Sequence, residues 1–340
     1  MVPITLACVG AGNWGRNLVR VFDSLPEVRL KTICDASEKI RDGMAAQYPN
    51  AQVESDFDNA LADPEINAVV LAVPAVHHFE TACKALEAGK HVYVEKPIAL
   101  SYDHARQLTE LAEGKGLVLM VGHLLEYHPA LGLLKKLVDS GELGDILYLY
   151  SERVNLGVVR KDENALWSLA PHDISMILHL VGAEPESVSA RGACYLQDGI
   201  EDVVFANLRF ADGKMAQVQV SWLDPHKVRK LTVVGTKKMA VFDDMESAEK
   251  VRIYDKAAER EGGAGTNYES YGESITLRFG DVVIPHIRPA EPLKLECQHF
   301  VDCVRDGATP VSDGRDGMRV VRVLEAASRS LAADGMPSVL

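Results

Sequence analysis

The chain has 340 residues, with 36 basic and 49 acidic side chains and a formal net charge of −13. Hydrophobic residues make up 47% and charged residues 25%, which is typical of a globular protein and excludes a disordered or collagen-like chain. The acidic balance argues against nucleic acid as a partner. No apolar run reaches the roughly 20 residues of a membrane span, and the length predicts two domains.

Strands and helices alternate regularly through residues 1–122. We predict strands at Ile4–Val9, Val28–Cys34, Ala51–Val53, Ala68–Val73, His91–Val94 and Leu117–Val121. We predict helices at Asn13–Asp23, Ser37–Gln47, Asp56–Leu61, His77–Ala88 and Tyr102–Glu113. This alternation indicates βαβ units and a parallel sheet, so residues 1–122 are predicted to form an α/β domain.

Residues 123–340 have a different pattern, in which strands follow one another. We predict strands at Ile146–Leu156, Ser187–Ala193, Val203–Phe210, Met215–Trp222, Lys230–Gly235, Met239–Asp243, Val251–Tyr254 and Ser274–Arg278. We predict helices at Pro129–Ser140, Trp167–Leu180, Leu293–Arg305 and Gly314–Ala333. Consecutive strands favour an α+β domain with a large, open, mostly antiparallel sheet. The glycine-rich stretch Glu259–Tyr271 is expected to be a loop, either a lid over a substrate or a simple connection.

A glycine-rich turn follows the first predicted strand. Gly10-Ala11-Gly12-Asn13-Trp14-Gly15 has the GxGxxG spacing and opens the first predicted helix. Such a turn lets the backbone approach a pyrophosphate, and the helix N-terminus offers free N–H groups to it. Asp35 ends the second strand, where its carboxylate can accept hydrogen bonds from ribose hydroxyls and repel a 2′-phosphate. The pattern predicts a Rossmann domain that binds NAD rather than NADP.

Glu95-Lys96-Pro97 follows the fifth predicted strand. Ligands of open α/β sheets lie at the carboxyl ends of the strands, so Lys96 is expected near the cofactor. A lysine there can polarise a sugar hydroxyl or move its proton. The alternative is a surface lysine at the start of a helix.

These residues, together with others along the chain, resemble the Gfo/Idh/MocA oxidoreductases. The resemblance rests on Gly10–Gly15, Asp35, Val73-Pro74, His78, Ala88–Val92, Glu95-Lys96-Pro97 and Trp167–Ser175. It implies hydride transfer between a nicotinamide cofactor and a sugar or cyclitol carbon. It also implies that Val73, Pro74, His78, Glu95 and Lys96 serve the cofactor, and that the C-terminal helices pack back on the Rossmann domain.

The family's second motif, D-x-G-x-H-x-x-D, reads here as Ser168 to Ser175. His172 matches, and the resemblance implies that it handles the substrate proton beside Lys96. Serine stands at both aspartate positions, Ser168 and Ser175, and cannot supply the negative field of a carboxylate. This departure argues against a strict lysine–aspartate–histidine relay.

Residues Gly122–Pro129, Glu152–Gly157 and Asn164–Trp167 resemble the nucleotide-sugar branch of the family, which includes UDP-N-acetylglucosamine 3-dehydrogenases. It implies NAD-dependent oxidation of a nucleotide-sugar hydroxyl, at C3 of UDP-N-acetylglucosamine, before a PLP-dependent aminotransferase acts. The implied substrate-binding residues are Lys96, His123, Glu126, Tyr127, Arg153, Asn155, Arg160, Trp167 and His172. Arginine favours phosphate because its guanidinium matches phosphate geometry. The alternatives are a free-sugar or inositol dehydrogenase and a non-catalytic dinucleotide-sensing regulator.

The remaining expectations concern location and partners. The beginning of the chain has no signal-peptide pattern, and six scattered cysteines without a CxxC pair indicate reduced thiols. We therefore expect a cytoplasmic protein with no metal site and no membrane association. The family resemblance implies a homodimer or homotetramer formed through the exposed sheet face.

Overall fold

The computed structural model describes residues 3–260 and 275–340. In these ranges, no helix has the length and apolar character needed to cross a membrane. The chain divides into two units, which are described separately. The first comprises Met1–His128 with Ala290–Glu325, and the second Pro129–Pro289 with Ala326–Leu340. The expected lid or connection at Glu259–Tyr271 falls almost wholly outside the described residues.

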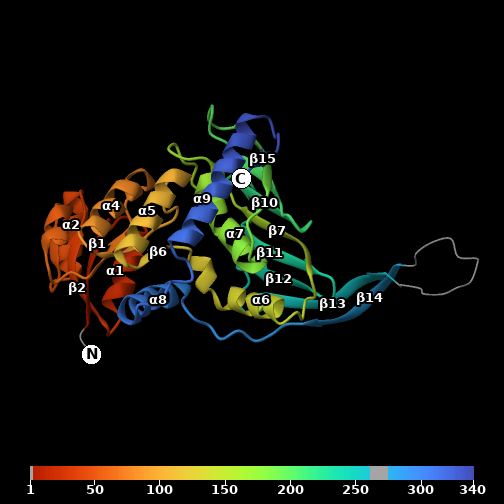
Figure 1. Cartoon of the computed structure of the whole chain (residues 1–340), viewed down its shortest axis with the longest axis horizontal. Coiled ribbons are helices and arrows are strands. Elements are labelled where there is room, and N and C mark those ends of the chain that lie inside the picture. The colour runs from red at the N-terminus through yellow and green to blue at the C-terminus, as the bar shows by residue number, and fades with distance from the viewer. Residues whose placement is uncertain (1–2, 261–274) are drawn as a thin grey trace, which may run out of the picture. The chain divides into compact units, whose positions relative to one another are not determined.

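The first unit is built on a six-stranded parallel sheet (Figure 1). Its strands are β1 (Ile4–Val9), β2 (Val28–Cys34), β3 (Gln52–Glu54), β4 (Ala68–Leu71), β5 (His91–Val94) and β6 (Leu119–Val121), in the order β3-β2-β1-β4-β5-β6. β4 is buried at all four positions, as its continuous apolar sequence requires. The strand order reverses at β1 and β4, and such a switch point is where doubly wound sheets bind ligands.

Helices cover both faces of this sheet. They are α1 (Gly15–Asp23), α2 (Glu38–Gln47), α3 (Phe57–Ala62), α4 (His78–Glu87) and α5 (Tyr102–Lys115), with α8 (Pro292–Asp306) from the end of the chain. Figure 1 shows α8 beside α1, where Phe300 packs edge-on against Phe22 at 6.1 Å between ring centroids. Tyr93 completes this aromatic cluster on β5. Burial of three large rings therefore attaches α8 to the sheet.

The second unit is a nine-stranded sheet in the order β14-β13-β12-β11-β7-β10-β9-β8-β15. Its strands are β7 (Ile146–Val154), β8 (Ser187–Ala193), β9 (Val203–Arg209), β10 (Met215–Ser221), β11 (Val228–Gly235), β12 (Met239–Asp243), β13 (Val251–Arg260), β14 (Ile275–Val283) and β15 (Ser338–Val339). All pairings are antiparallel except β7 with β10.

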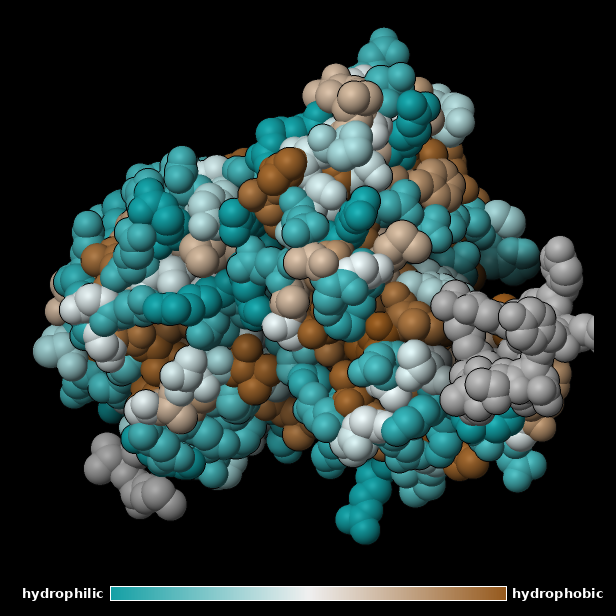
Figure 2. Space-filling view, turned by 45° about the vertical axis from the view of Figure 1, so that its right-hand side comes forward, coloured by the Kyte–Doolittle hydropathy of each residue, from teal (hydrophilic) through white to brown (hydrophobic). Residues whose placement is uncertain are grey.

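One face of this sheet is covered by helices α6 (Pro129–Asp139) and α7 (Ala165–Val181), as Figure 1 shows. Because these helices cover one face only, buried and exposed side chains alternate along β7. Leu149 and Ser151 are buried, whereas Tyr148 and Tyr150 on the opposite face are exposed. Below, the inner face means the side that faces α7, and the outer face means the other side. The surface seen in Figure 2 is mostly hydrophilic, with separate apolar patches.

The predicted fold class is confirmed in both halves, namely a parallel Rossmann sheet followed by a mostly antiparallel one. The predictions missed two 3₁₀ turns, η1 (Ala75–His77) and η2 (Leu124–Tyr127), and the short strand β15. They also ended β13 six residues early, because Asp255–Arg260 lacks an apolar pattern. The last long helix, α9 (Gly314–Ala332), matches its predicted range within one residue.

Candidate functional site

The glycine-rich turn between β1 and α1 is shaped by close backbone contacts. Gly10 has φ +85°, and a Cβ there would lie 2.6 Å from the carbonyl oxygen of Ala72. A Cβ on Gly15 would lie 2.0 Å from the carbonyl oxygen of Gly10. Gly12 differs, because a Cβ there would meet no atom within 4 Å. The first and last glycines are thus required by the turn itself, and Gly12 faces open space where a pyrophosphate can approach the backbone.

Asp35 connects this turn to the end of β2. Its Oδ2 accepts the Ala11 N–H at 2.8 Å and its Oδ1 accepts the Ser37 N–H at 2.8 Å. Both bonds fix the carboxylate beside the glycine-rich turn and leave further lone pairs on its oxygens. The residues present therefore fit a dinucleotide, with the glycine turn for its pyrophosphate and Asp35 for its ribose.

Glu95 joins the glycine-rich turn to the lysine segment. The indole Nε1–H of Trp14 donates to Glu95 Oε1, and Glu95 Oε2 accepts the Lys96 N–H at 3.2 Å. Burial raises the pKa of the Glu95 carboxyl, while Trp14 and Lys96 oppose that rise. A Cβ on Gly122 would lie 3.0 Å from this carboxylate, so glycine there leaves room for it. Glu95 thus positions both loops rather than standing open to a ligand.

His78 has a comparable buried position in α4. Its ring nitrogens lie 2.7 Å from the Pro97 carbonyl oxygen and 2.9 Å from that of Val73. Burial lowers the pKa of the imidazole, although both carbonyl contacts oppose this. With 1% of its surface exposed, His78 connects the segments after β4 and β5, so we assign it positioning rather than direct cofactor contact. Val73 and Pro74 lie at the end of β4, where the sequence predicted cofactor contacts.

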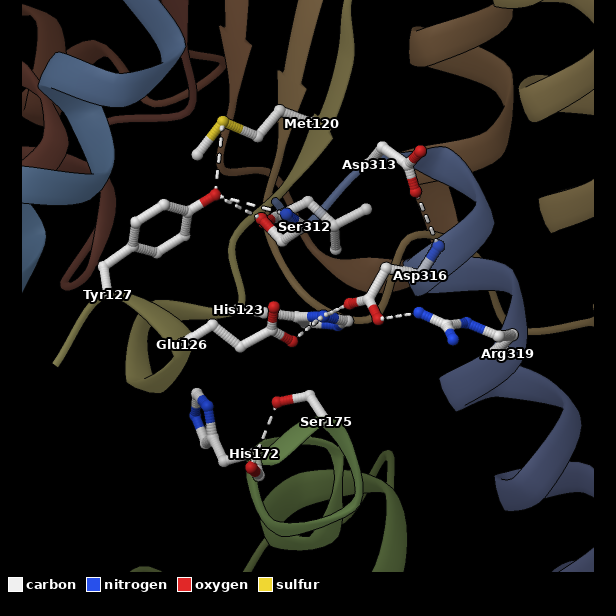
Figure 3. Close-up of polar contacts among 11 residues, drawn as sticks. Met120, His123, Glu126, Tyr127, His172, Ser175, Ser312, Asp313, Asp316 and Arg319 are labelled. Carbon is white, nitrogen blue, oxygen red and sulfur yellow. Dashed lines mark hydrogen bonds and ion pairs between the residues drawn. The ribbon is translucent and has the colours of Figure 1, made fainter. Parts of the chain in front are cut away.

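The segment after β6 carries a buried ionic network, shown in Figure 3. The Nδ1–H of His123 donates to Asp316 Oδ2 at 2.6 Å and lies 3.4 Å from Glu126 Oε1. The guanidinium of Arg319 donates to Asp316 Oδ1 at 2.8 Å. Burial opposes charge on His123, but its bonds to Asp316 and Glu126 outweigh burial and raise its pKa to about 10. Burial also raises the pKa of Glu126 to about 8.

The same three groups, His123, Glu126 and Asp316, have ligand atoms within 4.8 Å of one another and could in principle hold a metal ion. However, Asp316 is already held by protonated His123 and by Arg319, and the raised pKa of Glu126 favours its neutral form at pH 7. These contacts fit a hydrogen-bonded ion-pair network, and the absence of a metal site stays a prediction. His123 and Glu126 were predicted to contact the substrate, but the structure buries both side chains. Tyr127 is also mostly enclosed, and its hydroxyl lies 2.9 Å from Ser312 Oγ.

The charge on His123 makes the stability of the first unit dependent on pH. Its pKa rises from 6.5 unfolded to about 10 folded, so folding takes up a proton between these values. This contribution is complete below pH 6.5 and is lost as the pH rises towards 10. Denaturant unfolding from pH 7 upward should therefore show a falling free energy of unfolding, with a shallower slope in His123→Gln.

His226→Gln is the matched control, because the His226 side chain is 82% exposed. It should retain the pH slope of the original chain. Equal slopes in His123→Gln and the original chain would contradict the charged state assigned to His123.

Helix α7 carries the second motif in the other unit. Its N-terminus is capped by Asn164, whose Oδ1 accepts the Trp167 N–H at 3.1 Å. Trp167 is held from the other side by its indole N–H, which donates to Ser328 Oγ at 3.0 Å. Ser175 donates its hydroxyl to the His172 carbonyl oxygen at 3.1 Å. Serine at this position therefore donates a hydrogen bond to the backbone of its own helix. An ionised carboxylate has no proton to donate and could not form this bond.

Arg153, predicted to bind a phosphate, lies at the end of β7 with 6% of its surface exposed. Its Nε donates to Asp173 Oδ2 at 2.5 Å and its Nη2 to Asp173 Oδ1 at 3.4 Å. Arg160 forms an ion pair with Glu163 at 3.1 Å, and the Asn155 N–H donates to the Ser221 carbonyl oxygen at 3.2 Å. Both predicted arginines thus already have a carboxylate partner.

Within the first unit the structure brings together the glycine-rich turn, Asp35 and the Glu95-Lys96 segment. Within the second it brings together Asp173 and Arg153. Neither the role of Asp316 nor the pairing of Asp173 was predicted from the sequence. Asp173 directly follows the motif histidine, which is a usable signal, but nothing local connects Asp316 to His123.

Two family models match this chain. Residues 4–123 match the NAD-binding Rossmann fold of the oxidoreductase family GFO_IDH_MocA, and residues 132–241 match the GFO/IDH/MocA C-terminal domain. The chain belongs to the Gfo/Idh/MocA oxidoreductase family, and its first unit is an NAD(P)-binding domain.

Several relatives match over nearly their whole length. The scyllo-inositol 2-dehydrogenase (NAD(+)) of Bacillus subtilis is 27% identical, over 98% of this chain and 95% of the relative. The UDP-N-acetylglucosamine 3-dehydrogenase of Acidithiobacillus ferrooxidans is 27% identical, over 94% and 95%. The crystal structure of GenD2 from gentamicin A biosynthesis, in complex with NAD, is 28% identical with a TM-score of 0.82, over 100% and 97%.

Proposed function

We propose that this oxidoreductase uses NAD to oxidise a nucleotide-sugar hydroxyl to a ketone, at C3 of UDP-N-acetylglucosamine. The observation that carries the proposal is that Lys96 and His172 stand at the family's motif positions, Lys96 in the Rossmann domain and His172 in the C-terminal domain. Similarity along almost the whole chain to a UDP-N-acetylglucosamine 3-dehydrogenase supports the choice of substrate. A PLP-dependent aminotransferase could act on the resulting ketone.

The chain's own groups handle the proton of the reacting hydroxyl. A bound NAD would supply the hydride acceptor, and the residues at the glycine-rich turn and Asp35 would hold it. The proposed role of Lys96 Nζ is to polarise the hydroxyl, and the proposed role of the His172 imidazole is to accept its single proton. Glu95 and His78 hold the Lys96-Pro97 segment from two sides, which limits the positions open to Lys96. Because Ser168 and Ser175 replace the two aspartates of the family motif, the proposed proton transfer uses neither of those carboxylates.

A substrate panel with NAD, read as NADH absorbance, tests the proposal. UDP-N-acetylglucosamine should be turned over faster than free N-acetylglucosamine or scyllo-inositol. Preference for scyllo-inositol would support the alternative, since an inositol dehydrogenase is equally similar at 27% identity. Binding of NAD without turnover of any sugar would favour a dinucleotide-sensing regulator. Ser168 and Ser175, which replace the aspartates of the catalytic motif, support that alternative.

Asp35 is proposed to select NAD over NADP, since its fixed carboxylate would repel a 2′-phosphate. Asp35→Asn should reduce the ratio of kcat/KM for NAD to that for NADP by at least about tenfold, which corresponds to roughly 1.4 kcal/mol. Steady-state kinetics with both cofactors measures the ratio. Asp42→Asn, on the exposed side of α2, removes the same charge and should leave the ratio unchanged. An unaltered ratio in Asp35→Asn would remove Asp35 from cofactor selection.

We also propose a homodimer or homotetramer formed through the outer face of the nine-stranded sheet. Tyr148 (43%), Phe205 (42%) and Met215 (58%) are exposed on neighbouring strands of that sheet. Large exposed side chains gathered on one sheet face are typical of protein–protein interfaces. Sedimentation analysis of the original chain and of Tyr148→Glu tests this.

A further inference from the structure

Two arginines lie directly opposite one another on the inner face of the nine-stranded sheet. β7 pairs with β11 so that Arg153 and Arg229 are register partners. Leu231 and Val233, the next residues of β11 on the same face as Arg229, are buried, so this face is the inner one. Directly paired residues of an antiparallel ladder have Cβ atoms about 5 Å apart, and like charges in such a pair repel each other.

Only one of these arginines has a carboxylate partner. Arg153 is bonded to Asp173, which is fully enclosed in α7. The nearby Asp244 donates its backbone N–H to the Arg229 carbonyl oxygen, but its carboxylate forms an ion pair with Lys250 at 3.5 Å. Within residues 3–260 and 275–340, the Arg229 guanidinium forms no hydrogen bond or ion pair.

Charge counting around this pair leaves one positive charge in excess. Arg153, Arg229 and Lys250 carry three positive charges, and Asp173 and Asp244 carry two negative ones. Arg229 is half-buried, and burial together with Arg153 lowers the pKa of its guanidinium. A partly desolvated cation beside another cation is unfavourable unless an anion completes the site. Asp244 and Asp173 partly offset this through space, but neither carboxylate forms a hydrogen bond or ion pair with the Arg229 guanidinium among the described residues.

We propose that Arg229, together with Arg153, forms a subsite for a negatively charged group of the substrate, a phosphate or a carboxylate. Asp173 holds Arg153 and belongs to the same helix, α7, as the motif histidine His172, so the arginine pair and His172 lie in the same unit. A guanidinium binds either group through two parallel hydrogen bonds. The inference rests on the proposed function in one respect, namely that this unit binds the substrate.

The subsite would separate the two candidate substrate classes. A nucleotide sugar brings a diphosphate and a sugar acid brings a carboxylate, and either can neutralise Arg229. An inositol is neutral and would leave the excess charge in place. Arg229, which the sequence analysis did not select, is thereby assigned as a residue that determines specificity.

The test compares Arg229→Met with the control Lys230→Met. Lys230 is the next residue on the same strand, faces the outer side and pairs with Asp243 at 3.1 Å. Isothermal calorimetry should detect binding of UDP or of glucuronate to the original chain. Binding of UDP would identify the anionic group as a phosphate, and binding of glucuronate would identify it as a carboxylate. Affinity for that probe should fall at least tenfold in Arg229→Met and stay within twofold in Lys230→Met.

A second measurement distinguishes a ligand site from a structural role. Because Arg229 repels Arg153, the unfolding temperature of unliganded Arg229→Met should equal or exceed that of the original chain. A lower temperature, an unchanged affinity, or no binding of either probe at millimolar concentration would overturn the proposal. If UDP binds through Arg229 but UDP-N-acetylglucosamine is not oxidised, the proposed function fails while the subsite stands.

Discussion

Lys96→Met is expected to lower kcat by about 10²–10⁴-fold, the usual contribution of a positioned acid–base group. Methionine keeps the length and apolar stem of lysine but removes Nζ, so only proton handling is lost. Binding of NAD, followed by fluorescence titration, should change by less than about tenfold, which is small beside the loss in kcat. The measurement is single-turnover formation of NADH with whichever sugar of the panel the original chain oxidises.

Lys84→Met is the matched control for this loss. Lys84 lies on α4 of the same unit, and its side chain is 49% exposed beside Asp58. It should retain the original kcat within about twofold, as surface substitutions normally do. If Lys96→Met also turned over near the original rate, Lys96 would have no catalytic part, and the proposed mechanism would fail.

Gly12→Ala is expected to fold normally and to lose affinity for the dinucleotide by at least about tenfold, or roughly 1.4 kcal/mol. A methyl group at Gly12 meets nothing within 4 Å, so the unliganded chain accepts it without strain. The same methyl group occupies the space through which a pyrophosphate reaches the backbone. Calorimetric titration with NAD and a thermal unfolding curve measure the two effects separately.

Two further glycine substitutions serve as controls for Gly12→Ala. Gly114→Ala, in α5, also enters open space and should leave NAD affinity unchanged while stabilising the chain by about 0.4–1 kcal/mol. Gly15→Ala places a Cβ 2.0 Å from the Gly10 carbonyl oxygen, so it should disrupt the turn itself and destabilise the chain. Unchanged NAD affinity in Gly12→Ala would place the pyrophosphate elsewhere.

Much of the fold could be predicted because its signals are local. β1, β2 and β5 match their predicted ranges, since short apolar runs ending at glycine or at an acidic residue mark buried parallel strands. The glycine-rich turn could be predicted because its three glycines lie within a few residues of one another, and sterics require two of them, Gly10 and Gly15. Ser37, the first residue of the helix predicted at Ser37–Gln47, is the N-cap of α2, but its side chain makes no capping bond there. The sequence predicted where this helix begins, but it could not predict whether the Ser37 side chain forms a capping hydrogen bond.

The sequence by itself determined the two sheet classes, the dinucleotide turn with Asp35, and the motif residues Lys96 and His172. Only the tertiary structure decided which charges meet. His123 and Asp316 are 193 positions apart, and Arg153 meets Asp173 and Arg229 through a helix and a register that no local pattern encodes. The physical reason is that periodicity reports which side of an element is buried. The partner of a buried charge depends on how distant elements pack. That packing bonds Arg153 to Asp173, whereas the Arg229 guanidinium forms no ion pair among the described residues.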